Sequence, residues 1–147
     1  MKIKHLSILI SRIALFIIYF WFGFLKVIGQ SPASTMVHTL FDKTMAHMMP
    51  FISFGIFIVL FGLFEMLIGL LFILPGWERW ALSLFAFHMV TTILPIFVMS
   101  EVWTHFMVPT LEGQYIIKNI ALIACALSIW STITPLKSKV PDPLLTQ

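Results

Sequence analysis

The residues of this chain best suited to chemistry are ionisable groups set inside apolar runs. Glu65 stands in the middle of FGLFEMLIGLL, and His88 stands in FAFHMVTT. Lys26 and Lys118 stand in two further runs, FGFLKVIG and YIIKNIAL. A carboxylate or imidazole can accept and release a proton, and an ammonium can donate hydrogen bonds to an electronegative oxygen. We therefore predict Glu65 and His88 as catalytic residues and Lys26 and Lys118 as cofactor-binding residues.

The composition places these runs in a membrane. Of the 147 residues, 60% are hydrophobic and 10% are charged, with a mean hydropathy of +1.02. Soluble domains have about a quarter charged residues. About 20 apolar residues cross the hydrocarbon core. Four segments qualify: Ile8–Ile28, Phe51–Leu74, Trp80–Met99 and Tyr115–Thr134. The prediction is a single all-α domain over residues 1–147, an integral membrane four-helix bundle.

The distribution of basic residues predicts that both termini are cytoplasmic. Lysine and arginine are enriched in cytoplasmic flanks of membrane proteins. The first and third connections contain Lys43 alone, whereas six basic residues lie in the termini and the second connection: Lys2, Lys4, Arg12, Arg79, Lys137 and Lys139.

The first outer connection is predicted to contain a short amphipathic helix within Ala33–Met49. Its apolar residues recur at spacings of three and four, which is typical of a helix lying on a surface. A flexible loop is the alternative. The apolar side would comprise Met36, Val37, Leu40, Phe41 and Met48.

Small residues indicate that Glu65 faces inward. Gly55, Gly62 and Gly69 recur every seven residues in the second span, with Glu65 on nearly the same face. Glycine lets a neighbouring backbone approach closely, so this face is predicted to pack against protein.

His88 shares a face with Thr91 and Thr92 in the third span, and we predict Thr92 as a cofactor-binding residue. Helix rise places Glu65 and His88 near mid-membrane, where they meet if their helix faces agree. Lys26 and Lys118 are expected near the outer surface. A polar stripe in the fourth span is expected to complete an interior path to Glu65 and His88: Lys118, Ala121, Cys125 and Ser128.

Structural interpretations stand beside these functional ones. Both lysines lie close enough to an interface to snorkel. His88 could hydrogen-bond a neighbouring helix, and Glu65 could fix helix packing. Placing a carboxylate near mid-bilayer raises the free energy of membrane insertion by roughly 2.5–3.5 kcal/mol on insertion scales. In this setting the Glu65 carboxyl is expected to be either a neutral hydrogen-bond donor or the partner of a charged His88, and in either state it can carry a proton.

Several chemistries are disfavoured. Haem between two helices needs axial ligands at matching depth, and only His88 stands within a span. No metal site is predicted, because His38, His47 and His105 lack a tight ligand spacing. The single cysteine, Cys125, excludes a disulfide. A net charge of +3, widely scattered, gives no indication of nucleic-acid binding.

Three stretches carry a family resemblance: FGFLKVIGQSPAS, EMLIGLLFILP and PTLEGQYIIKNIALIA. They resemble the DoxX-like family of small four-helix membrane proteins, nearest to its reactive-chlorine-resistance branch. The resemblance implies a bacterial inner-membrane protein associated with quinone-linked redox complexes, and with oxidative stress or sulfur metabolism. It implies functional positions at Lys26, Glu65, Gly113, Lys118 and Asn119, and so adds Asn119 as a cofactor-binding residue.

The leading functional hypothesis is a redox-associated membrane subunit whose interior polar cavity holds a quinone headgroup or a small solute. Its expected partners are the lipid bilayer and a membrane redox partner or a second copy of the chain. The alternatives are a non-enzymatic carrier of small solutes or lipids, and a structural or assembly subunit of a membrane complex.

Overall fold

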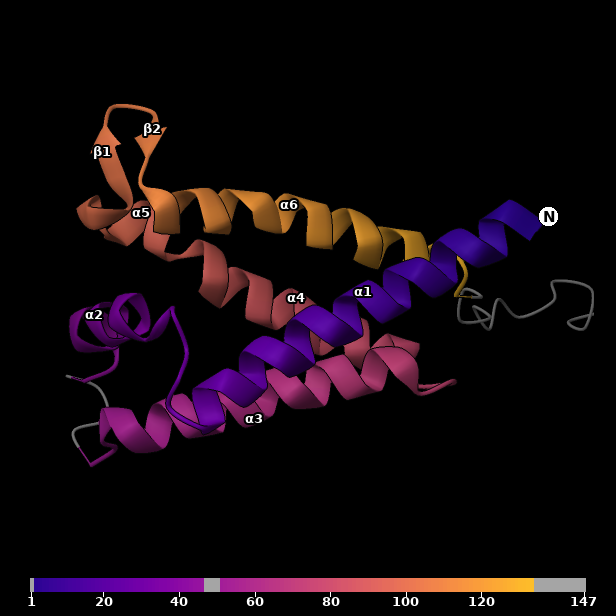
Figure 1. Cartoon of the computed structure of the whole chain (residues 1–147), viewed down its shortest axis with the longest axis horizontal. Coiled ribbons are helices and arrows are strands. Elements are labelled where there is room, and N and C mark those ends of the chain that lie inside the picture. Colours follow the sequence, from indigo (N-terminus) through magenta and orange to yellow (C-terminus); the bar gives the residue numbers. More distant parts are fainter. Residues whose placement is uncertain (1, 47–50, 134–147) are drawn as a thin grey trace, which may run out of the picture.

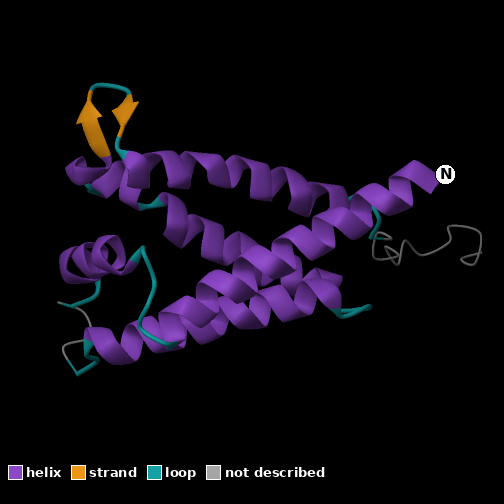
Figure 2. Cartoon of the chain, viewed as in Figure 1, coloured by secondary structure: helices purple, strands orange, loops and turns teal. Residues whose placement is uncertain are grey.

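The computed structural model describes residues 2–46 and 51–133 (Figure 1), which are mostly helical (Figure 2). Four helical segments are long and apolar enough to cross a membrane. These are α1 (Lys2–Val27), α3 (Phe54–Ile73), α6 (Leu111–Trp130), and α4 (Glu78–Ile93) continued by α5 (Pro95–Val98). The expected helical bundle with four helices of spanning length is confirmed. The short elements are α2 (Ser34–Thr44), the 3₁₀ turn η1 (Ser100–Val102), β1 (Trp103–His105) and β2 (Val108–Pro109).

Several span boundaries differ from those expected. Helices α1, α3 and α4 begin at Lys2, Phe54 and Glu78 rather than at Ile8, Phe51 and Trp80. Helix α6 begins at Leu111 rather than Tyr115, because the Thr110 side chain caps it by accepting a hydrogen bond from the Gly113 amide. The third span breaks after Ile93, since Pro95 has no N–H to continue the helix. Thr134, the expected end of the fourth span, lies outside the described residues.

The long helices form a closed ring. Helix α1 packs against α3 and α6, and α4 packs against the same two helices. Helix α2 and the β1–β2 hairpin lie at one end of the bundle, which we call the α2 end (Figure 1). The start of α1 and the α3–α4 turn lie at the other, which we call the turn end (Figure 1).

Glycines bring the backbones of α1 and α3 together. A Cβ at Gly62 would lie 2.6 Å from the Gly23 carbonyl oxygen, and a Cβ at Gly69 would lie 3.0 Å from the Phe20 amide nitrogen. The inward-facing glycine face is therefore confirmed at these two positions. Gly55 is exposed, with no atom within 4 Å of its would-be Cβ.

The bundle interior beside the turn end is apolar. Leu15, Ile68 and Phe72 are completely buried there, within a cluster to which all four long helices contribute. Arg12 closes this end. Its Nε donates to the Phe72 carbonyl at 2.7 Å, and its Nη1 donates to Glu78 at 2.8 Å. Arg12 therefore satisfies a carbonyl that the end of α3 leaves without an intrahelical partner and ties α1 to the start of α4.

Helix α2 packs across the other end of the bundle. Its Phe41 is buried, and its Met36 and Leu40 pack against a cluster of Met99, Val102 and Ile116. Lys43 on α2 donates to Glu101 on η1 at 2.6 Å, which holds the pKa of the Glu101 carboxyl below its usual value. A helix thus occupies part of the stretch predicted to be amphipathic, and its placement at a membrane surface stays a prediction. Met48 and Met49 lie outside the described residues.

The glycine crossing yields the first prediction. Gly62→Ala should destabilise the protein by about 1–3 kcal/mol, because an added methyl must separate two packed backbones. Gly55→Ala is the matched control in the same helix and should leave stability unchanged or slightly raised. Thermal unfolding in detergent measures both. Equal melting temperatures for the two variants would contradict the close approach.

Candidate functional site

The centre of the site is an ion pair between α1 and α3. The Lys26 ammonium lies 2.6 Å from Glu65 Oε2, and the two residues are only 5% and 6% exposed. Gly23 precedes Lys26 by three residues, as Gly62 precedes Glu65, so each glycine lies on the same helix face as its charged residue. The close crossing at the glycines is therefore what brings the two charges together.

His88 joins this pair from α4. Its Nε2 lies 3.0 Å from Glu65 Oε1, so both carboxylate oxygens have a partner. A carboxylate can only accept, and this contact is a hydrogen bond when His88 Nε2 carries a proton. His88 is 5% exposed.

Two hydroxyl groups face the other imidazole nitrogen. Tyr19 Oη lies 3.1 Å and Thr92 Oγ1 lies 3.2 Å from His88 Nδ1. Thr92 also donates to the His88 carbonyl oxygen at 2.9 Å. A hydroxyl can donate to a neutral imidazole or accept from a protonated one. The surroundings of His88 can therefore satisfy both of its protonation states.

Together these contacts form one run of hydrogen bonds across three helices, Lys26–Glu65–His88–Tyr19, which we call the buried network. In the described part of the chain, no buried side-chain nitrogen or oxygen lacks a hydrogen-bond partner. Heavy-atom separations of about 2.6–3.2 Å suit proton transfer. These separations are short enough for a proton to pass between the Glu65 carboxylate and the His88 imidazole, with the Tyr19 hydroxyl as a hydrogen-bond partner of the imidazole.

Aromatic rings fill the space between the buried network and α2. The Phe61 ring stacks on His88 at 5.2 Å between centroids, with an interplanar angle of 21°, and Phe57 stacks on Phe61 at 5.7 Å. The series continues to α2, where Phe41 lies 4.9 Å from Phe57. We call Phe41, Phe57 and Phe61 the aromatic column. It is the part of the interior that connects His88 with the α2 end.

The structure brings together four of the six predicted site residues: Lys26, Glu65, His88 and Thr92. Lys26 was expected near the outer surface, with snorkelling as one alternative, and that alternative is wrong. The helix crossing places Lys26 beside Gly62, where its side chain reaches the carboxylate instead of water.

The other two predicted residues lie on α6, apart from the buried network. Lys118 is exposed, with its ammonium 5.3 Å from the centroid of the Tyr115 ring, and Asn119 is half-buried. The expected interior path from Lys118 is wrong, because Lys118 and Ala121 both face outward. Helix α6 instead turns its apolar and small residues into the bundle: Gly113, Ile116, Ala126 and Ile129.

Tyr19 is the functional residue that sequence reasoning missed. It lies seven residues before Lys26, which is two helical turns and so the same face of α1. That spacing, with a hydroxyl inside an otherwise apolar run, was the available signal.

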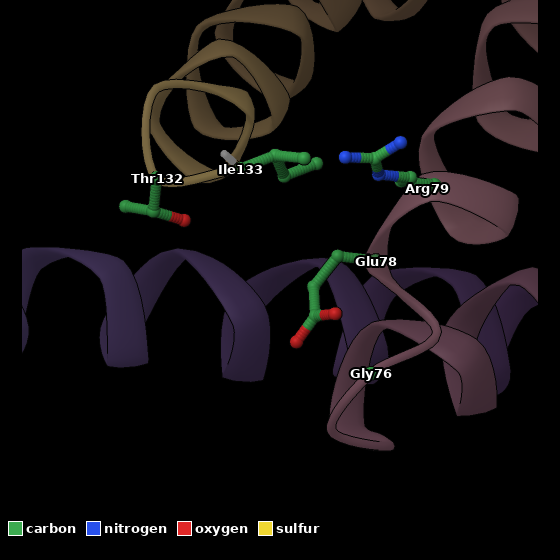
Figure 3. A pocket seen from close by; sticks show the side chains of 5 residues that line it. All are labelled: Gly76, Glu78, Arg79, Thr132 and Ile133. Carbon is green, nitrogen blue, oxygen red and sulfur yellow. The ribbon is translucent and has the colours of Figure 1, made fainter. Parts of the chain in front are cut away.

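A separate pocket of about 320 Å³ lies at the turn end, lined by Gly76, Glu78, Arg79, Thr132 and Ile133 (Figure 3). The Arg79 side chain extends toward Ile133, whereas the Glu78 carboxylate points away from both (Figure 3). Glu78 accepts a hydrogen bond from Arg12. About 12 Å of α3 separates Glu65 from Ile73 at this end. The pocket therefore does not open onto the buried network.

Metal binding finds no support in the described ranges, 2–46 and 51–133, which contain no group of three or more His, Cys, Asp and Glu able to hold an ion. His47, one of the histidines considered from the sequence, lies outside them.

No protein-family model, curated protein or solved structure matches this chain. The geometry of the buried network is therefore the basis for assigning a function.

The ion pair generates a stability prediction. Lys26→Met should destabilise the protein by about 3–5 kcal/mol, because it leaves the Glu65 carboxylate buried without its cation. Lys118→Met, the exposed control, should change stability by about 0.5 kcal/mol or less. The double variant Lys26→Met/Glu65→Leu should recover part of the loss, since it removes both charges.

Unfolding in detergent titrated with a denaturing surfactant measures all three variants. If Lys26→Met and Lys118→Met unfold at the same surfactant concentration, the Lys26–Glu65 contact contributes nothing to the free energy of unfolding. The ion pair would then not be what holds the buried network together.

Proposed function

We propose that this chain is a DoxX-like protein of a bacterial inner membrane that serves a redox or oxidative-stress system. Its buried network would exchange protons with a quinone headgroup or a small oxidisable solute. The observation that carries the proposal is the unbroken run of hydrogen bonds from Lys26 through Glu65 and His88 to Tyr19, inside the spanning helices. Ionisable groups at such depth mark proton relays and ligand sites by default.

The division of chemistry follows from the residue types. A quinone takes up protons as it gains electrons, and in this proposal the electrons come from a membrane redox partner. Glu65 and His88 supply and accept the protons, while Lys26 and Thr92 donate hydrogen bonds to the ligand oxygen. Lys118 and Asn119, which lie on the outward side of α6, would meet a ligand or a partner subunit approaching from the membrane.

The ligand is proposed to approach from the α2 end. On the turn side of the buried network the interior is closed by completely buried apolar residues, Leu15, Ile68 and Phe72. On the other side lies the aromatic column, whose half-buried rings Phe57 and Phe61 belong to a single helix. A planar headgroup could replace one of these rings and stack on the His88 imidazole.

One observation favours a second function, that of a structural subunit. Glu65 and His88 are enclosed, and their polar atoms already have partners within the chain. A network of this kind can fix which helix faces meet, as buried polar groups do in some proteins. Such a role needs no ligand and no change of protonation state.

The orientation that goes with the proposal has both termini in the cytoplasm. The α2 end then faces the opposite side of the membrane, with α2 lying at its surface. The support is the gathering of basic residues at the turn end, where Arg12 and Arg79 lie beside the α3–α4 turn.

Glu65→Gln separates the two functions. The amide keeps the shape of the carboxyl but cannot carry the proton, so the variant should fail to restore oxidant resistance. Because it also leaves the Lys26 ammonium without its anion, the variant is expected to lose stability as Lys26→Met does, and activities are compared only at matched abundance. The measurement is complementation of a deletion strain at matched abundance in the membrane. Glu112→Gln, at an exposed carboxyl of α6, is the control and should complement fully. Full activity of Glu65→Gln would favour the structural subunit.

Orientation is tested with single cysteines in a Cys125→Ser background. An impermeant maleimide added to intact cells should label Thr35→Cys, on the exposed side of α2, and spare His5→Cys, near the start of α1. Labelling at position 5, with protection at position 35, would reverse the assigned orientation.

A further inference from the structure

The β1–β2 hairpin ends in an unpartnered apolar tip. Phe106, Met107 and Val108 are 94%, 72% and 49% exposed. Three consecutive exposed apolar residues at a turn are unfavourable in water. The segment Thr104–Val108 contains no lysine, arginine or acid that would attract a charged partner.

The turn holds Met107 in a backbone conformation that is unfavourable for a residue with a side chain. Met107 has a φ of 59°, in the left-handed region that glycine and asparagine adopt far more readily. Residues held in sparsely populated conformations gather at functional positions, because the surrounding structure must maintain them. A methionine side chain at this turn therefore points to a role for the side chain itself.

The base of the hairpin is fixed to the bundle. The Thr110 amide donates to the Val102 carbonyl at 2.9 Å, and the Trp103 indole N–H donates to the Ile96 carbonyl at 3.1 Å. Gly113 lets this segment rest on the first turn of α6, where a Cβ would collide with the Val102 carbonyl. The base of the hairpin is thus held against the start of α6.

Two features set the level of the tip relative to the bilayer. Met107 is only four residues before Leu111, where the fourth candidate span begins, and four residues reach about 14 Å at most. The hairpin also extends across the long axis of the bundle rather than along it (Figure 1). The tip therefore stays near the end of the span, at the level of a headgroup layer roughly 5–8 Å deep.

We propose that the β1–β2 hairpin is an interfacial membrane anchor whose tip, Phe106–Val108, inserts among the lipid headgroups and upper acyl chains beside the α2 end. The lipid bilayer is the occupant that these observations fit, since the tip is apolar, uncharged and held at the bilayer surface. The anchor is independent of proton exchange by the buried network.

The test places a spin label at Phe106→Cys, and separately at Met107→Cys, in the full chain carrying Cys125→Ser. The protein is reconstituted in phosphatidylcholine vesicles, and collisions with oxygen and with a water-soluble nickel complex are measured. Val90→Cys, on the 69% exposed Val90 of α4, provides the lipid reference. Thr35→Cys on α2 provides the aqueous reference.

We expect collisions of the tip labels with the nickel complex to fall several-fold below those at Thr35→Cys, with oxygen collisions between those at Thr35→Cys and those at Val90→Cys. Nickel accessibility equal to that at Thr35→Cys would overturn the anchor, because the tip would lie in water. Protection from both reagents would also overturn it, because a second copy of the chain would then cover the tip. Using two labelled positions keeps the outcome readable if one variant folds poorly.

Discussion

The ion pair between Lys26 and Glu65 constrains the rest of the bundle, because both charges lie away from water. Removing a single charge from water carries a penalty of several kcal/mol, roughly offset when an opposite charge and further hydrogen bonds lie at contact distance. Helices α1 and α3 must therefore cross closely, and Gly23 and Gly62 permit that crossing. The remaining carboxylate oxygen then requires a donor, which fixes the face that α4 presents through His88.

The polar interior divides the bundle into two halves of different character. Towards the turn end, large aliphatic and aromatic residues fill the core, among them the completely buried Leu15, Ile68 and Phe72. Towards the α2 end, the interior is built of aromatic rings that lead from His88 to a helix lying across the bundle. An imidazole with hydroxyls on one nitrogen and a carboxylate on the other sits at the boundary between them.

Apolar length and glycine spacing were sufficient to predict the four spans and the inward direction of Glu65. They could not locate Lys26, because counting helix rise gives the depth of a Cα atom and not the direction of a long side chain. The tilt at which two helices cross decides whether that ammonium reaches water or a carboxylate. The face of α6 was misjudged for a related reason, since small residues pack a helix interface equally well on either side. Tyr19 was not predicted because a single tyrosine in an apolar run is typical of a packing residue.

The separation of the two charges in the chain has a consequence for biogenesis. Lys26 and Glu65 are 39 residues apart, so α1 leaves the ribosome before its counter-charge does. The nascent helix must then be inserted with an unpaired ammonium, which insertion scales penalise less when it lies near a helix end than at the centre. Lys26 stands one residue from the end of α1, where it can remain hydrated until α3 arrives. Its position thus suits co-translational insertion as well as the finished fold, and burial of the charge becomes the step that commits the two helices to each other.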